Sequence, residues 1–477
     1  MAEERTRRLA GNTAIIAIGQ FGSKVLVYLL TRVYTELLTT KEYSLATNVS
    51  EIATVLIPLI SLGIGEAIFR LAKGDEFKKK EVFTDAFVIW LVGCLFIPFI
   101  VPVILNVGFL KNYFADYIPL ILFYVMASVF HTICTNYIRA KGKVRLYAIQ
   151  GILNTALVIC LNIIFLIPLK MSSFGYVLSV PCADLIVTLF IIVKEKLWRD
   201  FDIKSVRKSS LKTMLRYSVP LIPTTVFMWI INISDRLMVT FMVGDAENGV
   251  YSAGYKIPTL LGIINSIFIY AWQISAMEEA NGKDKKEFFS SVFSSYSSLM
   301  FLLCGGMTLF SRVISYLMFS KSYNDQGVWI YIPILCVAMA LHNFSSFLDS
   351  DNMVRMKSVP TMLTAFAGAV VNVALNFYLI RYVRLNAMGA AIATYVSYLV
   401  TFTLRAIIVR KTIRVNVIDC ILNNLLLIAM SIVTVNEPSH WILIDILLFA
   451  VIVIVNFREL FEIFKKLYLM LSRRSSS

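Results

Sequence analysis

Residues 146–168 read LYAIQGILNTALVICLNIIFLIP, and this stretch contains no Asp, Glu, Lys or Arg. About 20 apolar residues in a helix span the roughly 30 Å of bilayer hydrocarbon, so the stretch is long enough to cross a membrane. Lys143 and Arg145 precede it, and Lys170 follows it. The stretch is therefore predicted to be a transmembrane helix between charged loops.

The composition of the whole chain agrees with this local pattern. Of its 477 residues, 58% are hydrophobic and 16% are charged, and the mean hydropathy is +0.75. Soluble domains are typically about 45–50% apolar and about 25% charged. The composition excludes an ordinary soluble protein, and it excludes a disordered chain because disorder requires low hydrophobicity.

Similar apolar runs recur from end to end and predict an all-α polytopic membrane protein with about 14 transmembrane helices. The loops between them stay below about 20 residues, so helices and short turns can satisfy the backbone. The predicted spans cover residues 12–38, 43–70, 82–107, 115–138, 146–168, 172–193, 212–242, 248–277, 288–311, 327–350, 359–380, 386–409, 416–435 and 439–464.

Lysine and arginine predict the orientation of these spans. With a cytoplasmic N-terminus, 34 of the 45 basic residues lie in or beside cytoplasmic loops, and seven lie on the opposite side. The loop after the twelfth span is assigned Arg405, Arg410, Lys411 and Arg414. The net charge of +15 thus reflects topology and attraction to anionic lipids, and no nucleic-acid partner is expected. We predict the cytoplasmic (inner) membrane of a bacterium, with both termini in the cytoplasm.

An internal repeat appears at a spacing of 214 residues. Tyr117-Ile118-Pro119 recurs as Tyr331-Ile332-Pro333, and Leu161-Asn162 recurs as Leu375-Asn376. A repeat of six spans predicts two pseudo-symmetric six-helix lobes that share a midline cavity, plus a C-terminal helix pair. The predicted domains are an N-terminal lobe (1–194), a cytoplasmic linker (195–211), a C-terminal lobe (212–411) and the appended pair with its tail (412–477).

Four basic residues remain at membrane depth, where an ionisable group costs about 2.5–3.5 kcal/mol on insertion scales and is a functional candidate. Polar residues recur around them at helical spacing in the first and seventh spans. We predict that these groups line a water-filled cavity that binds an anionic substrate. The predicted cavity residues are Lys24, Arg32, Arg236 and Lys256, together with Tyr28 and Asn232.

Carboxylates at membrane depth could carry a proton or a cation through a transport cycle. The candidates are Asp184, Glu66, Glu51 and Asp235. A structural alternative stays open for both sets, because the outermost cations could snorkel to the interface or form packed ion pairs with these carboxylates. His131 and His342, in the fourth span of each lobe, are interpreted as packing residues.

No catalytic or metal-binding motif is present in the sequence: GxGxxG, GxxxxGK[ST], HExxH and paired cysteines at ligand spacing are all missing. We therefore predict a protein that is not an enzyme and that holds no cofactor and no metal. Pro220 and Pro223 predict a kink in the seventh span.

Three groups of motifs point to a family. The first runs from Gly11-Asn12-Thr13 to Glu42-Tyr43, and the second joins residues 217–223 to Ser234-Asp235-Arg236 and residues 249–258. The third joins residues 371–376 (VNVALN) to 389–394 (GAAIAT). Together they resemble Wzx-type polysaccharide biosynthesis proteins, the lipid-linked oligosaccharide flippases, over nearly the whole chain. Ser44 departs from the pattern, which usually has Gly after Glu-Tyr.

The resemblance implies a two-lobed carrier of the superfamily that also contains multidrug extruders and the lipid II flippase. It implies translocation of a polyprenyl-diphosphate-linked oligosaccharide by alternating access, for a surface polymer such as O-antigen or capsule. The cavity would be lined by the first, second, seventh and eighth helices, and its four cations would receive the diphosphate. The implied partners are this substrate, membrane lipids and glycan-assembly proteins.

Two other classes remain open. A cation-coupled small-molecule or multidrug antiporter would use carboxylates as its main cavity groups. An integral-membrane glycan polymerase or acyltransferase would need a large external loop or a catalytic His, and the largest predicted external loop covers only residues 312–327.

Overall fold

The computed structural model describes residues 30–73, 77–105, 113–219, 222–278, 284–354, 359–459 and 461, and within them it contains helices and no strands. Ten of the described helices are long and apolar enough to cross a membrane. The predicted all-α membrane fold is confirmed. Most of the predicted first span, 12–38, lies outside the described residues, so the total of 14 spans stays a prediction.

The chain divides into two compact units, Met1–Trp229 and Ile230–Ser477. Their boundary falls inside helix α11 (Ile222–Met242). Residue 212, where we predicted the second lobe to begin, lies in α10 (Lys208–Ser218), and this helix packs on α4 and α5 of the first unit.

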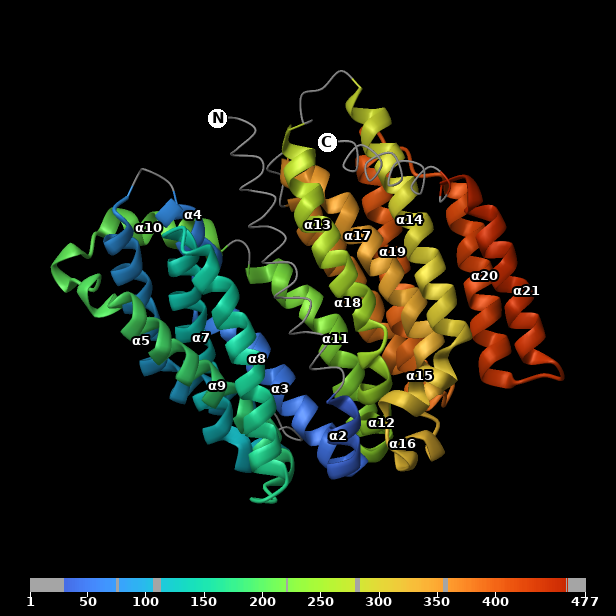
Figure 1. The fold of residues 1–477 in the computed structure, drawn as a ribbon, viewed down its shortest axis with the longest axis horizontal. Helices are drawn as coiled ribbons and strands as arrows, with labels where there is room; N and C mark the ends of the chain where they lie inside the picture. Colours follow the sequence, from blue (N-terminus) through green and yellow to red (C-terminus); the bar gives the residue numbers. More distant parts are fainter. Residues whose placement is uncertain are drawn as a thin grey trace, which may run out of the picture. The chain divides into compact units, whose positions relative to one another are not determined.

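The first unit is a helical bundle built around α7 (Ile118–Ala140), which contacts α3, α4, α5, α8 and α9 (Figure 1). Trp90 of α5 illustrates this packing, because its indole Nε1 donates to the Met126 carbonyl of α7 over 3.0 Å. The other helices of the unit are α2 (Thr31–Leu37), α3 (Thr40–Ile60), α4 (Ile64–Lys73), α5 (Lys79–Leu105), α8 (Val144–Leu166) and α9 (Ser172–Glu195).

The second unit is built in the same way around α17 (Ile332–Val354), which contacts α13, α14, α19 and α20 (Figure 1). Of the membrane-spanning helices described, α17 and the turn before it have the largest buried share, 78%. The other helices are α12 (Asp245–Lys256), α13 (Thr259–Glu278), α14 (Lys285–Leu309), α15 (Ser311–Met318), α16 (Lys321–Asp325), α18 (Val359–Arg381), α19 (Asn386–Val409), α20 (Val417–Asn436) and α21 (Trp441–Val455).

The predicted repeat appears in the helix bounds. Helices α7 and α17 begin at residues 118 and 332 and end at residues 140 and 354, a spacing of 214 at both ends. Helices α9 and α19 keep the same spacing. An added Cβ would lie 2.9 Å from Phe165 Cβ at Gly175 and 3.1 Å from Leu379 Cβ at Gly389, so the repeat preserves a close helix contact at a glycine.

Two predicted single spans are each two helices, which corrects the span list. The span predicted over 43–70 is broken between α3 and α4, where Leu62 and Gly63 have φ angles of +49° and +67°. Pro58 lies inside α3, and the helix continues past it to Ile60. The span predicted over 248–277 is broken at Ile257–Pro258, between α12 and α13. Helix α10 ends at Ser218 and α11 begins at Ile222. Pro220, one of the two prolines for which we predicted a kink, lies outside the described residues.

The predicted linker is held against the first unit. Asp200 accepts hydrogen bonds from Lys141 Nζ over 2.8 Å and from Tyr137 OH over 3.1 Å, and Lys80 Nζ lies 3.5 Å away. Burial disfavours the charge of Asp200, but the hydrogen bond and charge of Lys141 and the Tyr137 hydroxyl prevail, so the pKa of Asp200 is lowered. The predicted linker, residues 195–211, is therefore packed against the first unit through Asp200.

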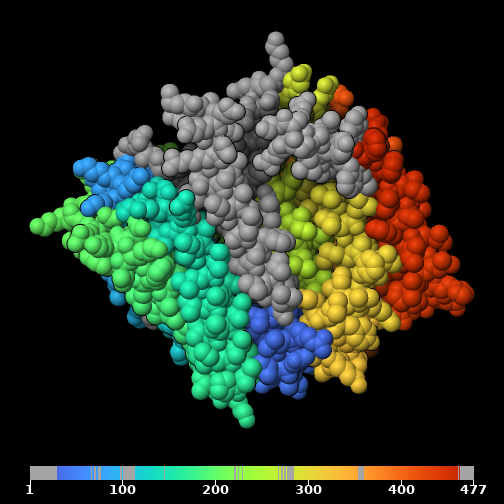
Figure 2. All heavy atoms as spheres, in the orientation of Figure 1, coloured from blue at the N-terminus to red at the C-terminus, as the bar shows by residue number. Residues whose placement is uncertain are grey.

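Helices α20 and α21 form the appended pair. They contact each other and α14, and Figure 2 shows their atoms (red) beside those of α14 (yellow) on the second unit. The Arg312 guanidinium lies 4.1 Å from the Trp329 ring centroid and 5.4 Å from that of Trp441, and it pairs with Glu437. This cation–π contact ties the loop before α21 to the rest of the unit.

Candidate functional site

The predicted cavity residues of the first unit are only partly described. Lys24 and Tyr28 lie outside the described residues. Arg32 is in α2, about half exposed, and its Nε donates to Glu36 Oε1 over 2.9 Å. Exposed pairs of this i, i+4 kind contribute little stability. The predicted partners of the deep cations did not include Glu36.

The predicted cavity residues of the second unit lie together on α11 and α12. Asn232 Oδ1 accepts from Tyr255 OH over 2.9 Å and from Tyr398 OH over 3.3 Å. The Arg236 guanidinium lies 5.4 Å from the Tyr255 ring centroid, within cation–π range. Lys256 is half-buried at the last position of α12. The structure thus brings an amide, a guanidinium and two phenols to one place in this unit.

Asp235 lies beside these groups and is fully buried. Its Oδ1 accepts from Asn372 Nδ2 over 3.0 Å and from Asn376 Nδ2 over 2.6 Å. Its Oδ2 accepts from Tyr251 OH over 2.9 Å and from the Thr394 hydroxyl. Four donors use all the acceptor sites of a carboxylate, and such partners are what make burial of the group tolerable.

The shell around Asp235 can also receive a positive ion. The amide oxygen of Asn376 is buried and has no hydrogen-bond partner in the described part of the chain. The hydroxyls of Tyr251 and Thr394 can rotate and present lone pairs in place of their protons. A buried carboxylate whose shell holds two hydroxyls and one unpartnered amide oxygen is therefore suited to exchange a proton or a small cation.

A second buried carboxylate, Asp184 of α9, anchors a network in the first unit. Asp184 Oδ1 lies 3.0 Å from His131 Nδ1 and accepts from Asn154 Nδ2 over 2.7 Å, while Oδ2 accepts from Ser128 Oγ over 2.5 Å. The other ring nitrogen of His131 lies 3.0 Å from Gln150 Oε1. We interpreted His131 as a packing residue, and the network that it joins was not predicted.

The remaining residues named from the sequence are Glu51, Glu66 and His342. Glu51 is half-buried in α3, and its backbone carbonyl accepts from Trp229 Nε1 over 3.0 Å. Glu66 falls in α4, and its side chain lies outside what the structure describes. His342 packs against Tyr398, with ring centroids 4.8 Å apart.

One charged residue was misassigned. Arg405 was placed in a loop, whereas it lies in α19 with 4% exposure. Its Nε donates to Thr364 Oγ1 over 3.1 Å, and its Nη1 donates to the Ser345 carbonyl over 3.0 Å. The span predicted over 386–409 has the bounds of α19 and already contains Arg405, so the error was to count this residue with the loop. The polar partners satisfy the buried cation.

Comparison with known sequences identifies one family. The sequence model of the family described as "Polysaccharide biosynthesis protein" matches residues 9–274. No curated protein matches the chain.

Comparison with solved structures identifies the fold. A lipid II flippase MurJ in an inward closed conformation has a TM-score of 0.67 at 12% identity, and the match covers 96% of this chain and 99% of that one. A multidrug resistance MATE family transporter of the MOP superfamily, in an outward-facing conformation, gives 0.61 at 16% identity, covering 84% and 94%. A MOP superfamily transporter from Pyrococcus furiosus, described by the reverse polarity of its binding pocket, gives 0.61 at 17% identity, covering 84% and 96%.

Proposed function

Because this multi-pass membrane chain belongs to the polysaccharide biosynthesis protein family, we propose that it is a flippase for a polyprenyl-diphosphate-linked oligosaccharide. In this proposal it acts by alternating access in the cytoplasmic membrane, with both termini in the cytoplasm, and carries out no covalent chemistry. The substrate would serve a cell-surface polysaccharide, and its polyprenyl tail would stay in the lipid while the polar head crosses through the protein.

The observation that carries the proposal is the cationic, amide- and phenol-rich patch on α11 and α12. Arg236, Lys256 and Asn232 lie there with Tyr255. A diphosphate in bare hydrocarbon would cost tens of kcal/mol by ion solvation alone, whereas fixed cations and hydrogen-bond donors replace its hydration. We propose that Lys24 and Arg32 make the equivalent contacts from the first unit, with Tyr28 beside them.

We further propose that the buried carboxylates couple transport to an ion. Asp235 is the first candidate, because its shell holds the unpartnered oxygen of Asn376. Asp184 is the second, through its contact with His131. Glu51 and Glu66 remain candidates for ion coupling only because the sequence predicts that they lie at membrane depth.

The proposed function can be tested with vesicles that contain the purified chain and a lipid-linked oligosaccharide labelled on its sugar. An impermeant quencher should reach only the outer leaflet in protein-free vesicles, about half of the label. With the chain present, we expect the protected fraction to fall toward zero. Protection that stays unchanged in vesicles holding folded protein would refute the flippase.

A multidrug antiporter is the second candidate, and the Asp184 network is the observation that favours it. Such a carrier depends on a carboxylate, so Asp184→Asn should abolish export of a fluorescent organic cation from cells. Under the flippase proposal, neither the wild type nor the variant lowers the cell content of that dye. Dye export by the wild type that is lost in Asp184→Asn would favour the antiporter.

A further inference from the structure

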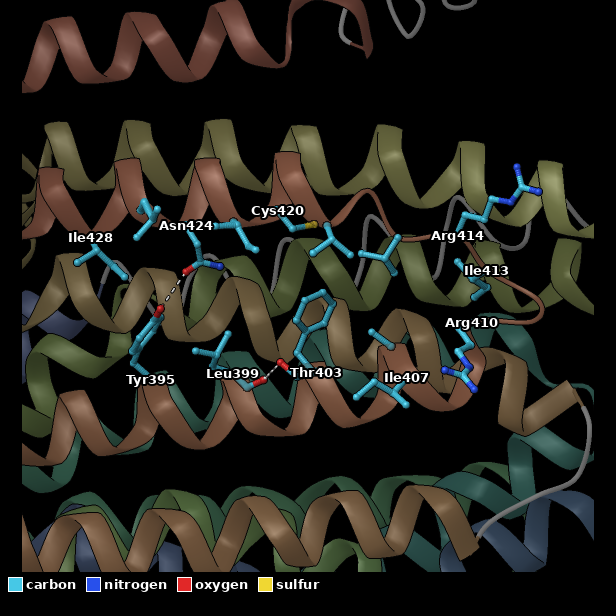
Figure 3. Close-up of a pocket in the computed structure, with 16 residues that line it drawn as sticks. Tyr395, Leu399, Thr403, Ile407, Arg410, Ile413, Arg414, Cys420, Asn424 and Ile428 are labelled. Atoms are coloured by element: carbon cyan, nitrogen blue, oxygen red, sulfur yellow. Dashed lines mark hydrogen bonds between the residues drawn. The ribbon is translucent and has the colours of Figure 1, made fainter.

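An apolar cavity of about 750 Å³ lies between α19 and α20 of the second unit (Figure 3). Its volume falls in the range of about 300–1,000 Å³ that is usual for small-molecule sites. Ile407, Ile421 and Leu425 line it and are 54%, 55% and 59% exposed. Large apolar side chains with this exposure on a membrane-spanning helix face the lipid, so the cavity is a groove that bilayer lipid can enter.

The groove has a polar bridge at one end and continues past it. Tyr395 OH donates to Asn424 Oδ1 over 3.2 Å and links the two helices (Figure 3). Beyond this bridge lies a second cavity of about 320 Å³, which shares Tyr395 and Ile428 with the first and reaches Val435. The seam between α19 and α20 is therefore open along much of its length.

The other end of the groove carries two arginines, Arg410 and Arg414 (Figure 3). Both are exposed, and neither forms an ion pair with a carboxylate in the described part of the chain. The loop that holds them is fixed, because Ile413 is buried and the Arg414 N–H donates to Ser290 Oγ over 2.8 Å. The nearby Asp419 is held by Asn416 and does not line the groove.

The dimensions fit one lipid chain. Tyr395 lies within α19, and Arg410 lies directly after its last residue. The two are 15 positions apart, which corresponds to roughly 22 Å along the helix. One leaflet contributes about 15 Å of hydrocarbon, so a chain whose head lies at Arg410 stays inside the groove to the middle of the bilayer. Guanidinium groups match phosphate oxygens in a fork geometry.

We propose that this groove is a binding site for an anionic diacyl phospholipid of the bilayer. The phosphate lies at the arginine end of the groove, where Arg410 and Arg414, whose guanidinium groups point to opposite sides in Figure 3, turn to bind it. One acyl chain lies between α19 and α20. The head is on the side that the basic residues predict to be cytoplasmic, where anionic lipids collect at juxtamembrane arginines. The groove is lined by other residues of α19 than Thr394 and Tyr398, which contact Asp235 and Asn232.

The site also touches the Asp235 network through one helix. Thr394 and Tyr398 of α19 contact Asp235 and Asn232, while Tyr395 and Leu399 of the same turns line the groove. An occupied groove would therefore hold α19 in position against α11.

The test uses the full chain, purified in detergent and stripped of lipid. We expect phosphatidylglycerol to bind as one molecule per chain in native mass spectrometry and to raise the melting temperature more than phosphatidylcholine does. The double variant Arg410→Gln/Arg414→Gln should bind phosphatidylglycerol about tenfold or more weakly, as loss of a charge-assisted hydrogen bond implies. Lys204→Gln/Lys208→Gln is the matched control, because it removes two exposed cations elsewhere and should leave binding unchanged.

A second variant tests the chain-binding part of the groove. Ala406→Trp fills the groove and keeps both arginines, so it should abolish binding of phosphatidylglycerol even if the double variant does not fold. Equal affinity of the wild type for phosphatidylglycerol and phosphatidylcholine would overturn the proposal. So would equal losses in the lysine control, or binding of polyprenyl phosphate in place of phosphatidylglycerol.

Discussion

Replacing Asp235 by Asn is expected to uncouple transport from its driving ion while the protein still inserts and folds. The amide keeps the shape of the side chain but places an NH₂ group where a carboxylate oxygen now accepts two hydrogen bonds. Coupling free energies between sites are about 1–3 kcal/mol, which corresponds to about 5–150-fold. We expect the stimulation of flipping by a sodium or proton gradient to fall by a factor in this range.

The measurement is the initial flipping rate in vesicles, with and without each gradient, at equal amounts of inserted protein. Asp445→Asn is the matched control: Asp445 is also fully buried and accepts from Thr434 Oγ1 over 2.8 Å, but it lies in α21, apart from the Asp235 network. Its gradient dependence should match the wild type. If Asp235→Asn kept full stimulation by both gradients, Asp235 would be a packing residue only.

The helices of this chain could be predicted from the sequence because a helix that crosses the bilayer needs about 20 apolar residues. The 214-residue spacing predicted from Tyr117-Ile118-Pro119 and Tyr331-Ile332-Pro333 is also the spacing between the starts and between the ends of α7 and α17, since equivalent helices must cross the same hydrocarbon. The breaks at Leu62–Gly63 and Ile257–Pro258 were not predicted, because apolar residues continue through both turns. Hydropathy indicates whether a segment enters lipid, but it does not indicate where the helix within that segment breaks.

The candidate site was predicted less completely. The charged residues stood out because each is rare in an apolar span, and Asn232, Asp235 and Arg236 do lie together in the structure. Their partners were hidden, since Asn372 and Asn376 are uncharged and lie far away in the sequence.

A signal for those partners was present in the third motif. Its residues 371–376 and 389–394 hold Asn372, Asn376 and Thr394, three of the four donors to Asp235. The two asparagines are four positions apart, which places them on one helix face. Two amides on one face of an apolar span predict a buried polar partner, although only the structure identifies that partner as Asp235.

Replacing Arg236 by Gln is expected to weaken flipping by loss of substrate recognition. The side chain is half-buried beside Tyr255 on α11, so its charge is only partly screened. Hydrogen bonds to charged groups contribute about 1.5–3 kcal/mol, and we expect the half-saturating concentration of lipid-linked oligosaccharide to rise by about tenfold or more. Arg236→Lys keeps the positive charge but lacks the forked guanidinium, so its half-saturating concentration should lie between those of the wild type and Arg236→Gln.

Substitutions of Arg236 and of its neighbour Asp235 should change different properties of transport. If Arg236 binds the diphosphate, Arg236→Gln alters the substrate concentration needed for transport and leaves the gradient dependence intact, the reverse of Asp235→Asn. Arg381→Gln is the control, because Arg381 is exposed at the end of α18 and its loss should leave both quantities unchanged. Should Arg236→Gln and the wild type need the same substrate concentration, the cation would serve the packing of α11 against Tyr255, and the diphosphate site would have to be sought elsewhere.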